Sequence, residues 1–129
     1  MIDAAVKALA QAPNYATVAT VMPDGLIQNQ VLWVDADDTH ILINTEVGRQ
    51  RYRNVVRDNR MTVTIFENGN WYHWAEVRGR VDEIVTGSEA RAHIDALSMK
   101  YTGAPYGRPI QTERVILKLR PERQLVYPS

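Results

Sequence analysis

The amino-acid sequence predicts a mainly β domain with accessory helices, in which about six antiparallel strands form a small closed or half-open barrel. Segments rich in β-branched and aromatic residues recur along the chain between turn signals, which is typical of strands joined by hairpins. Apolar residues on both faces of such strands must be covered, so the sheet closes on itself or packs under helices. The 129 residues are expected to form one domain, residues 1–129.

The first half of the chain carries mainly strand and turn signals. Residues 2–12 are expected to form a helix that Asp3 caps and Pro13 ends. Strands are expected over residues 15–21, 27–35 and 40–44, with a tight turn at Met22-Pro23-Asp24-Gly25. The segment 40–44 is apolar on both faces, which predicts a central strand.

The second half adds two helices and three strands. A helix is expected over residues 47–58, with Thr45 or Glu46 near its start, and strands over 60–67, 71–85 and 112–120. The sequence Thr86-Gly-Ser-Glu89 has the form of a capping box, so a further helix should begin there. Its apolar stripe is Ala90, Ile94, Leu97 and Tyr101. Residues 102–111 contain two Gly and two Pro and are expected to form a loop.

Composition excludes several classes of function. Fifteen Lys and Arg balance fifteen Asp and Glu, so the chain lacks the basic field of a nucleic-acid-binding protein. No apolar run is long enough to span a membrane, and the first residues do not resemble a secretory signal, so a cytoplasmic protein is expected. Cysteine is absent, which excludes disulfides and thiol catalysis. The three histidines are scattered, so no metal site is expected.

The sequence contains no nucleophile elbow and no glycine-rich phosphate loop. If the protein is an enzyme, we therefore expect a bound cofactor to supply the reactivity.

Arginines are concentrated between residues 49 and 60, at Arg49, Arg51, Arg53, Arg57 and Arg60. The first turn of a helix offers free N–H groups and the positive end of the helix dipole, which together favour an anion. Arg49 and Arg51 at that position cost about 0.3–1 kcal/mol unless an anion is bound. The pattern predicts a phosphate close to the helix axis. It fits equally well an exposed basic helix paired with Asp58, Glu46 and the acidic residues 35–38.

Aromatic residues form the second feature of the sequence, at Trp33, Trp71, Tyr72 and Trp74. Trp33 shares one strand face with Asn29 and Val31. This set fits a barrel core or an oligomer interface. It also fits an apolar wall for a flat ring, with Asn29 and Asn44 as polar anchors. A barrel that binds single-stranded nucleic acid would need interleaved basic residues, and only Arg78 and Arg80 are near.

Several stretches resemble the split β-barrel, FMN-binding-protein-like family related to pyridoxamine 5′-phosphate oxidases, and most of all its small enzymes that use the deazaflavin coenzyme F420. They are residues 16–25, 31–34, 44–45, 48–54, 57–58, 76–81 and 100–106, and the resemblance runs from about residue 8 to residue 127. It implies a homodimer with two cofactors at the subunit interface. It places the coenzyme phosphate at residues 45–54 and the ring against residues 29–33. In this family the position of Arg51 is commonly Lys.

The resemblance implies a set of cofactor-binding residues. They are Asn29, Val31, Trp33, Asn44, Thr45, Arg49, Gln50, Arg51, Asn54 and Trp74. The implied activity is an F420-dependent reductase that transfers a hydride from the reduced deazaflavin to an unsaturated organic acceptor, a small molecule. Two alternatives remain open at this point: an FMN-dependent oxidoreductase of the same fold, and a carrier that binds a cofactor or another ring-shaped ligand without turnover.

Overall fold

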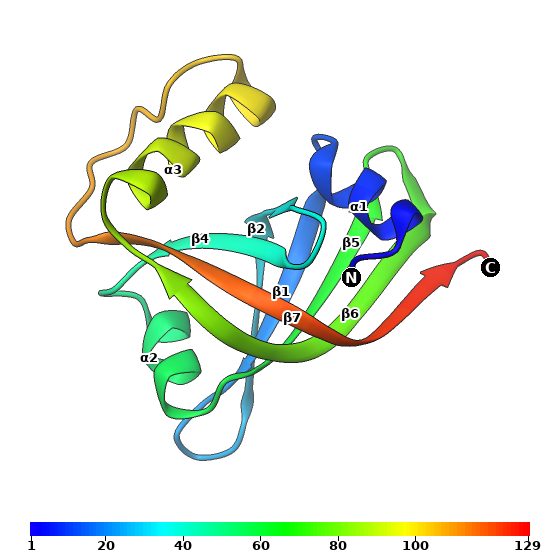
Figure 1. Cartoon of the computed structure of the whole chain (residues 1–129), viewed down its shortest axis with the longest axis horizontal. Coiled ribbons are helices and arrows are strands. Elements are labelled where there is room, and N and C mark those ends of the chain that lie inside the picture. Colours follow the sequence, from blue (N-terminus) through cyan, green and yellow to red (C-terminus); the bar gives the residue numbers. More distant parts are fainter.

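The structure, a computed structural model that describes all residues 1–129, is an antiparallel sheet that curls on itself and carries three helices (Figure 1). The helices are α1 (Ala4–Gln11), α2 (Gln50–Arg57) and α3 (Gly87–Thr102). The strands are β1 (Tyr15–Val21), β2 (Ile27–Trp33), β3 (Asp35–Ala36), β4 (Ile41–Glu46), β5 (Arg60–Glu67), β6 (Asn70–Val85) and β7 (Arg114–Tyr127). The predicted turn between β1 and β2 is present, with Gly25 at a φ of 89°.

All neighbouring strands are antiparallel, in the order β2-β1-β5-β6-β7-β4-β3. The sheet curls until β2 approaches β4, which gives the expected barrel-like form. It has seven strands, so the expectation of six was wrong. The predicted strand 27–35 breaks after Trp33, and its last part pairs instead with β4 as the two-residue β3. In addition, β7 extends to Tyr127 because it pairs with β6 from Val85 back to Trp74.

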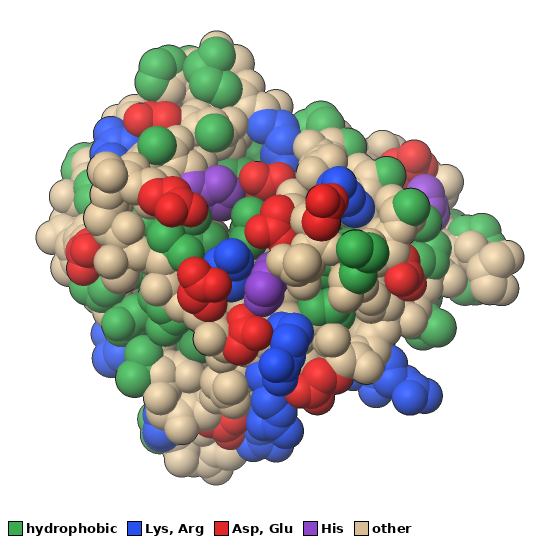
Figure 2. Space-filling model, in the orientation of Figure 1, with side chains coloured by type: hydrophobic (Ala, Val, Ile, Leu, Met, Phe, Trp, Pro, Cys, Tyr) green, Lys and Arg blue, Asp and Glu red, His purple; other side chains and the backbone are tan.

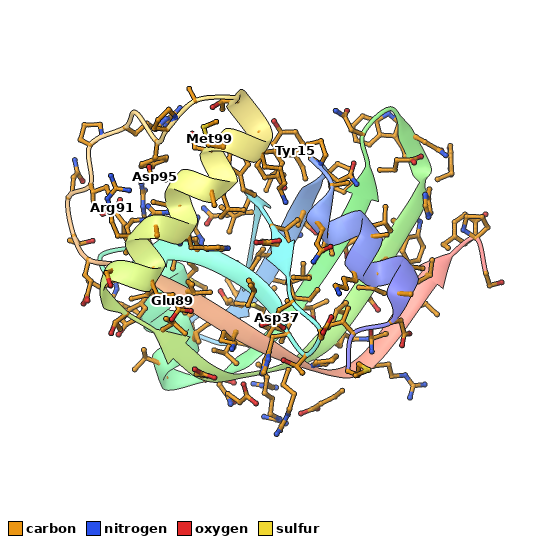
Figure 3. All side chains as sticks on the ribbon, turned by 45° about the horizontal axis from the view of Figure 1, so that its top comes forward. Tyr15, Asp37, Glu89, Arg91, Asp95 and Met99 are labelled. Carbon is orange, nitrogen blue, oxygen red and sulfur yellow. The ribbon has the colours of Figure 1, made fainter.

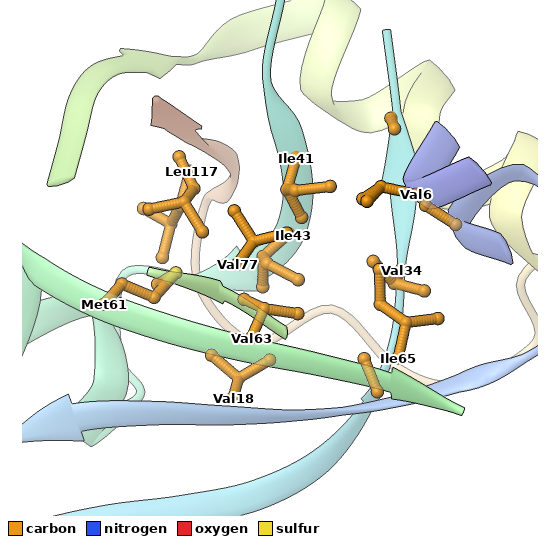
Figure 4. Packing of buried hydrophobic residues seen from close by; sticks show 14 of the residues in the cluster. Val6, Val18, Val34, Ile41, Ile43, Met61, Val63, Ile65, Val77 and Leu117 are labelled. Carbon is orange, nitrogen blue, oxygen red and sulfur yellow. The ribbon is translucent and has the colours of Figure 1, made fainter. Parts of the chain in front are cut away.

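The barrel interior is filled by side chains from alternate positions of its strands. Val18, Val63 and Val77 lie opposite one another on β1, β5 and β6, and all three are buried. Figure 4 shows these valines packed with Ile43 and Ile65 in the same cluster. Because the interior is close-packed, a ligand site has to lie at the rim of the barrel or on its surface.

Helix α3 packs across β4 and β7 and buries Ala90, Ile94 and Leu97, as the apolar stripe predicted. It covers the outer face of β4, whose inner face contributes Ile41 and Ile43 to the core. Strand β4 is therefore buried on both faces although it is second from the edge of the sheet. The expected interior strand is present, since β4 pairs with β7 on one side and with β3 on the other, and α3 covers its outer face.

The helix ends differ in detail from the expectations. Asp3 and Thr86 occupy the N-cap positions of α1 and α3, but neither side chain makes a capping hydrogen bond, so the predicted caps are not formed. Helix α2 begins at Gln50 rather than at residue 47, because Arg49 N–H closes a turn onto the Glu46 carbonyl at 3.0 Å. Arg49 is thus the N-cap residue of α2.

Acidic and basic side chains are interspersed on the face of the molecule shown in Figure 2, in agreement with the balanced composition. No helix of the structure combines the length and the apolar character needed to cross a membrane.

Candidate functional site

A cavity of about 400 Å³ lies where β2, β4, α3, the start of α2 and the segment 103–113 meet. Six of the ten residues proposed from the sequence line it: Val31, Trp33, Asn44, Thr45, Arg49 and Arg51. The first two come from β2, the next two from the end of β4, and the arginines from the start of α2. The curl of the sheet brings β2 and β4 together, so residues distant in the sequence line the same cavity.

The other four proposed residues do not line this cavity. Asn29 is exposed on β2. Asn54 is fully buried, and its amide nitrogen donates to Thr20 Oγ1 at 3.1 Å, which ties α2 to β1. Gln50 donates to Asn54 Oδ1 at 2.8 Å. Trp74 stacks on Tyr127, with ring centroids 5.4 Å apart, and lines a second hollow with Phe66 and Trp71.

Arg51 is held at one end of the cavity. Its Nη1 donates to Thr45 Oγ1 at 2.9 Å and its Nη2 to Gln30 Oε1 at 2.8 Å. Burial lowers the pKa of Arg51, and the positive charges of Arg49 and Arg114 lower it further. The guanidinium group therefore lies in a region of excess positive charge and keeps further donors for a ligand.

The arginines of α2 do not pair with carboxylates. Asp58 pairs with Arg60 at 2.6 Å, and Glu46 pairs with Arg114 at 3.2 Å. Arg53 and Arg57 instead donate to the backbone carbonyls of Gly48 and Val21. Of the arginines between residues 49 and 60, only Arg60 makes the ion pair with Asp58 that the exposed-helix interpretation predicted, and Glu46 pairs with Arg114 instead. The charges of Arg49, Arg51, Arg53 and Arg57 are not compensated by carboxylates.

Arg114, the first residue of β7, is the most deeply buried arginine of the cavity, with 8% of its surface exposed. Its Nε donates to Asn44 Oδ1 at 2.9 Å, and its Nη1 donates to Glu46 Oε2 at 3.2 Å. Glu46 also accepts from the Thr112 backbone and hydroxyl, at 2.8 and 3.0 Å. A guanidinium group carries five N–H donors, so three donors of Arg114 have no protein acceptor.

Asn44 is fixed from its other side by α3. Its Nδ2 donates to the Ala90 carbonyl at 3.0 Å and lies 3.1 Å from His93 Nδ1. Because Nδ2 can only donate, His93 Nδ1 accepts and the ring proton is on Nε2, which lies 3.1 Å from Asp35 Oδ2. A continuous chain of hydrogen bonds thus runs from Asp35 through His93 and Asn44 to Arg114.

Aromatic rings form the wall at the other end of the cavity. Trp33 stacks on Tyr101 at a centroid distance of 5.1 Å and meets the edge of Tyr106 at 6.3 Å. Tyr15 packs against Tyr101 at 5.4 Å. Burial raises the pKa of Tyr101 to about 12, so its hydroxyl stays neutral and donates to the Asn14 carbonyl. The wall is therefore rigid and uncharged.

Comparison of the chain with known proteins identifies its family. Residues 2–126 match the family described as pyridoxamine 5′-phosphate oxidase. The chain belongs to the pyridoxamine 5′-phosphate oxidase family. No protein of curated function matches it by sequence.

Solved structures agree with this assignment. An F420 reductase is 28% identical with a TM-score of 0.82, over 96% of this chain and 98% of that one. A conserved hypothetical protein of Mycobacterium tuberculosis is 23% identical with a TM-score of 0.76, over 96% and 82%. The Group A Streptococcus protein HupZ is 19% identical with a TM-score of 0.70, over 100% and 96%. The last two show the fold alone. The family and the F420 reductase together indicate an oxidoreductase related to flavin and deazaflavin enzymes.

In this member of the family the segment 103–113 is tied to α3. The backbone N–H of Tyr106 donates to Asp95 Oδ1 at 3.1 Å, and Asp95 also accepts from Arg91 at 2.8 Å. Figure 3 shows Arg91 and Asp95 on the side of α3 that faces this segment, and Tyr15 near the other end of the helix, by Met99. Asp95 therefore fixes Tyr106 against the cavity.

Sequence reasoning did not assign seven lining residues to the site: Tyr15, Leu32, Ile94, Leu97, Tyr106, Arg108 and Arg114. Ile94 and Leu97 belong to the predicted stripe of α3, and Tyr106 to a stretch that resembles the family. Arg114 gave no signal, because the alternation of residues 112–120 predicted only a strand with a polar face.

A row of aromatic side chains connects the cavity with the second hollow. Trp33 lies opposite Tyr15, Tyr15 opposite Phe66, Phe66 opposite Trp74, and Trp74 opposite Tyr127, across five neighbouring strands. Opposite residues share a face of the sheet, so this row lies on one face. The neighbouring positions Val31 and Leu125, on β2 and β7, are exposed.

Proposed function

We propose that the protein is a coenzyme F420-dependent reductase that transfers a hydride from the reduced deazaflavin to an unsaturated organic acceptor. The observation that carries the proposal is the cavity, which combines uncompensated arginines at one end with a flat aromatic wall at the other. The 28% identity with an F420 reductase over nearly the whole of both chains supports the same coenzyme.

The side chains of the cavity fit such a coenzyme. Thr45, Arg49 and Arg51 would hold its phosphate, since arginines with free donors beside a hydroxyl match an anionic group. Val31 and Trp33 would support the ring. When bound, the deazaflavin supplies an electron pair as hydride. The chain would contribute orientation of ring and acceptor, and exclusion of water by the aromatic wall.

The proposal includes a homodimer with the cofactors at the subunit interface. Beside the aromatic row, the same face carries a second row of opposite residues, of which Val31 and Leu125 at the two ends are exposed: Val31, Thr17, Thr64, Glu76 and Leu125. An exposed face of this kind is typical of an interface. If a two-fold axis runs parallel to the strands through β5, Tyr127 of a second copy, with Trp74 stacked on it, would lie near Trp33 of the first. Trp74 would then contribute to the site from across the interface.

The dimer is tested by sedimentation of the wild type and of Thr64→Arg, a change in the middle of that face. We expect a dimer for the wild type and a monomer for the variant, with weaker coenzyme binding by the monomer. A monomeric wild type with full coenzyme affinity would contradict the interface.

The coenzyme is tested by fluorescence titration of the purified protein with F420 and, separately, with FMN. We expect F420 to bind with micromolar or better affinity and to exclude FMN. Preferential binding of FMN would assign an FMN-dependent oxidoreductase of the same fold. Binding of F420 without oxidation of its reduced form by any unsaturated acceptor would assign a carrier, and binding of neither would reject the proposal.

A further inference from the structure

Two arginines of the cavity are not used by the proposed phosphate site. Arg114 lines the cavity and keeps N–H donors, those of Nη2 among them, without a protein acceptor, although more than nine-tenths of its surface is buried. Arg108, on the exposed segment 103–113, also lines the cavity and has neither an ion-pair nor a hydrogen-bond partner. No buried polar side-chain atom of the protein lacks a hydrogen-bond partner, so the free donors of Arg114 reach the solvent of the cavity, where a ligand can accept from them.

Arg114 contacts the aromatic wall, and Arg108 lies two residues after Tyr106 in the chain. The Arg114 Cζ atom lies 5.3 Å from the centre of the Tyr106 ring, and Tyr106 meets Trp33 at 6.3 Å. Arg51, in contrast, is directed to Thr45 and Gln30 on β4 and β2. Positive charge therefore extends along the cavity from Arg51 to Arg114, which interact electrostatically, and Arg114 also contacts the aromatic ring of Tyr106.

The balance of charge indicates what the Tyr106 end of the cavity accepts. Four arginines line the cavity, and the Glu46 carboxylate compensates one of them. A phosphate group carries about −1 as a diester and about −1.5 to −2 as a monoester, so it compensates at most two more. At least one positive charge is left at the Tyr106 end. A carboxylate supplies one negative charge in a planar form that matches the edge of a guanidinium group.

We propose that Arg108 and Arg114 form a carboxylate site, so that the cavity binds a phosphate at the Arg51 end and an acidic, flat, unsaturated ligand at the Tyr106 end. The existence of the site does not depend on the proposed function. The assignment of the carboxylate to the hydride acceptor rests on that function, because the same group could belong to an acidic tail of the coenzyme.

The first arm of the test measures binding of trans-cinnamate and of methyl cinnamate by calorimetry, with the protein free and loaded with F420. The two probes share ring and double bond and differ in the negative charge. We expect the wild type to bind the acid about tenfold more tightly than the ester, as one charged hydrogen-bonded contact implies. Arg108→Gln should remove this preference. Equal affinity for acid and ester, or no measurable binding of either, would overturn the proposal.

Matched variants distinguish loss of the carboxylate site from a general loss of positive charge. Arg120→Gln removes an exposed arginine of β7 that lies 3.8 Å from Asp82, outside the cavity, and should keep the preference for the acid. Arg114→Lys keeps the charge but loses the planar fork, and should weaken cinnamate more than the ester. If Arg114→Lys fails to fold, Arg108→Gln still tests the carboxylate site. Residue 108 is exposed, so this substitution is expected to leave the fold intact. A preference that survives in Arg108→Gln as in Arg120→Gln overturns the assignment.

The second arm titrates the same variants with F420 and FMN, and it identifies the source of the carboxylate. If Arg108→Gln weakens cinnamate and leaves F420 unchanged, the carboxylate belongs to the acceptor. If it weakens F420 and leaves FMN unchanged, the carboxylate belongs to the coenzyme, and the site stands with that ligand. If the wild type binds cinnamate more tightly than methyl cinnamate but binds neither coenzyme, the carboxylate site is supported and the proposed function is rejected.

Discussion

Asn44 Oδ1 accepts a hydrogen bond from Arg114 Nε at 2.9 Å, and this contact orients the most deeply buried arginine of the cavity. The amide is itself held by Ala90 and His93 of α3. Rotation of the amide by 180° would place its nitrogen against Arg114 Nε, donor against donor. The position of the Arg114 guanidinium thus depends on α3, which is distant from it in the sequence.

We expect Asn44→Ala to lower the free energy of unfolding by about 1–3 kcal/mol, since it leaves Arg114 Nε and His93 Nδ1 without partners. It should also weaken binding of cinnamate. Thermal and denaturant unfolding measure the first effect and calorimetry the second. Gln111→Ala is the control, because only the backbone of Gln111 makes a hydrogen bond. Equal stability of the two variants would show that the amide does not support Arg114.

Arg51 and Arg53 provide a matched pair for the proposed phosphate site. Both lie in α2 and both donate to neutral acceptors, but only Arg51 lines the cavity. We expect Arg51→Ala to weaken coenzyme binding about 10- to 100-fold, as loss of charged hydrogen bonds implies. Arg53→Ala should bind as the wild type does. Fluorescence titration measures the affinity of both variants for the coenzyme. Equal affinities would show that the phosphate does not bind at Arg51.

Arg51→Lys tests the geometry separately from the charge. The resemblance to the family implies Lys at this position, which would hold a phosphate by its charge alone. Lys cannot donate to Thr45 and Gln30 in the same planar arrangement. We therefore expect an affinity for the coenzyme between those of the wild type and Arg51→Ala. An affinity as low as that of Arg51→Ala would mean that the planar fork, rather than the charge, makes the contact.

The lowered pKa of Glu46 leads us to expect that the protein is less stable at acidic pH. Burial raises the pKa of Glu46, but hydrogen bonds from Thr112 and Gln111 and the charge of Arg114 outweigh it, so the pKa lies below its ordinary value of 4.5. A carboxyl group with a lowered pKa in the folded state stabilises the fold above its unfolded pKa. This stabilisation is lost as the pH falls through the lower, folded pKa.

We expect the free energy of unfolding to fall below about pH 4.5 in the wild type, with a shallower slope in Glu46→Gln. At neutral pH the variant should be about 3 kcal/mol less stable, because it leaves the buried charge of Arg114 without its partner. Urea unfolding at several pH values measures both effects. An unchanged acid slope in the variant would assign the acid sensitivity to other carboxylates, such as Asp35, whose pKa is also lowered.

Much of the fold could be predicted because strand and turn signals are local. Residues 15–21 and the turn at Met22–Gly25 agree with the structure, and so does the stripe of α3. The break after Trp33 could not be predicted, because the residues on either side suit a strand and only the closure of the sheet makes Asp35 pair with β4. The length of β7 depends similarly on pairing with β6.

The cavity could be predicted where its residues lie in a local pattern. The residues Arg49, Arg51, Asn44 and Thr45 fall around one strand end and helix start, a local pattern that predicts an anion site, and all four line the cavity. Arg114 was not foreseen, because its role arises from pairing with Glu46 across two strands distant in the sequence. Asn54 was assigned to the cofactor, yet its hydrogen bonds hold α2 to β1. Such a role depends on tertiary contacts that spacing does not reveal.

Gly79 allows β6 and β7 to approach closely at an irregularity in their register. A Cβ atom at this position would lie 2.0 Å from the Arg120 carbonyl oxygen, which is backbone and cannot rotate away. We expect Gly79→Ala to lower the free energy of unfolding by about 1–3 kcal/mol, the usual cost of forced overpacking. Gly107→Ala is the control, because a Cβ atom there meets nothing within 4 Å. Thermal unfolding compares the two, and a Gly79→Ala variant as stable as Gly107→Ala would mean that the two strands can separate here at little cost.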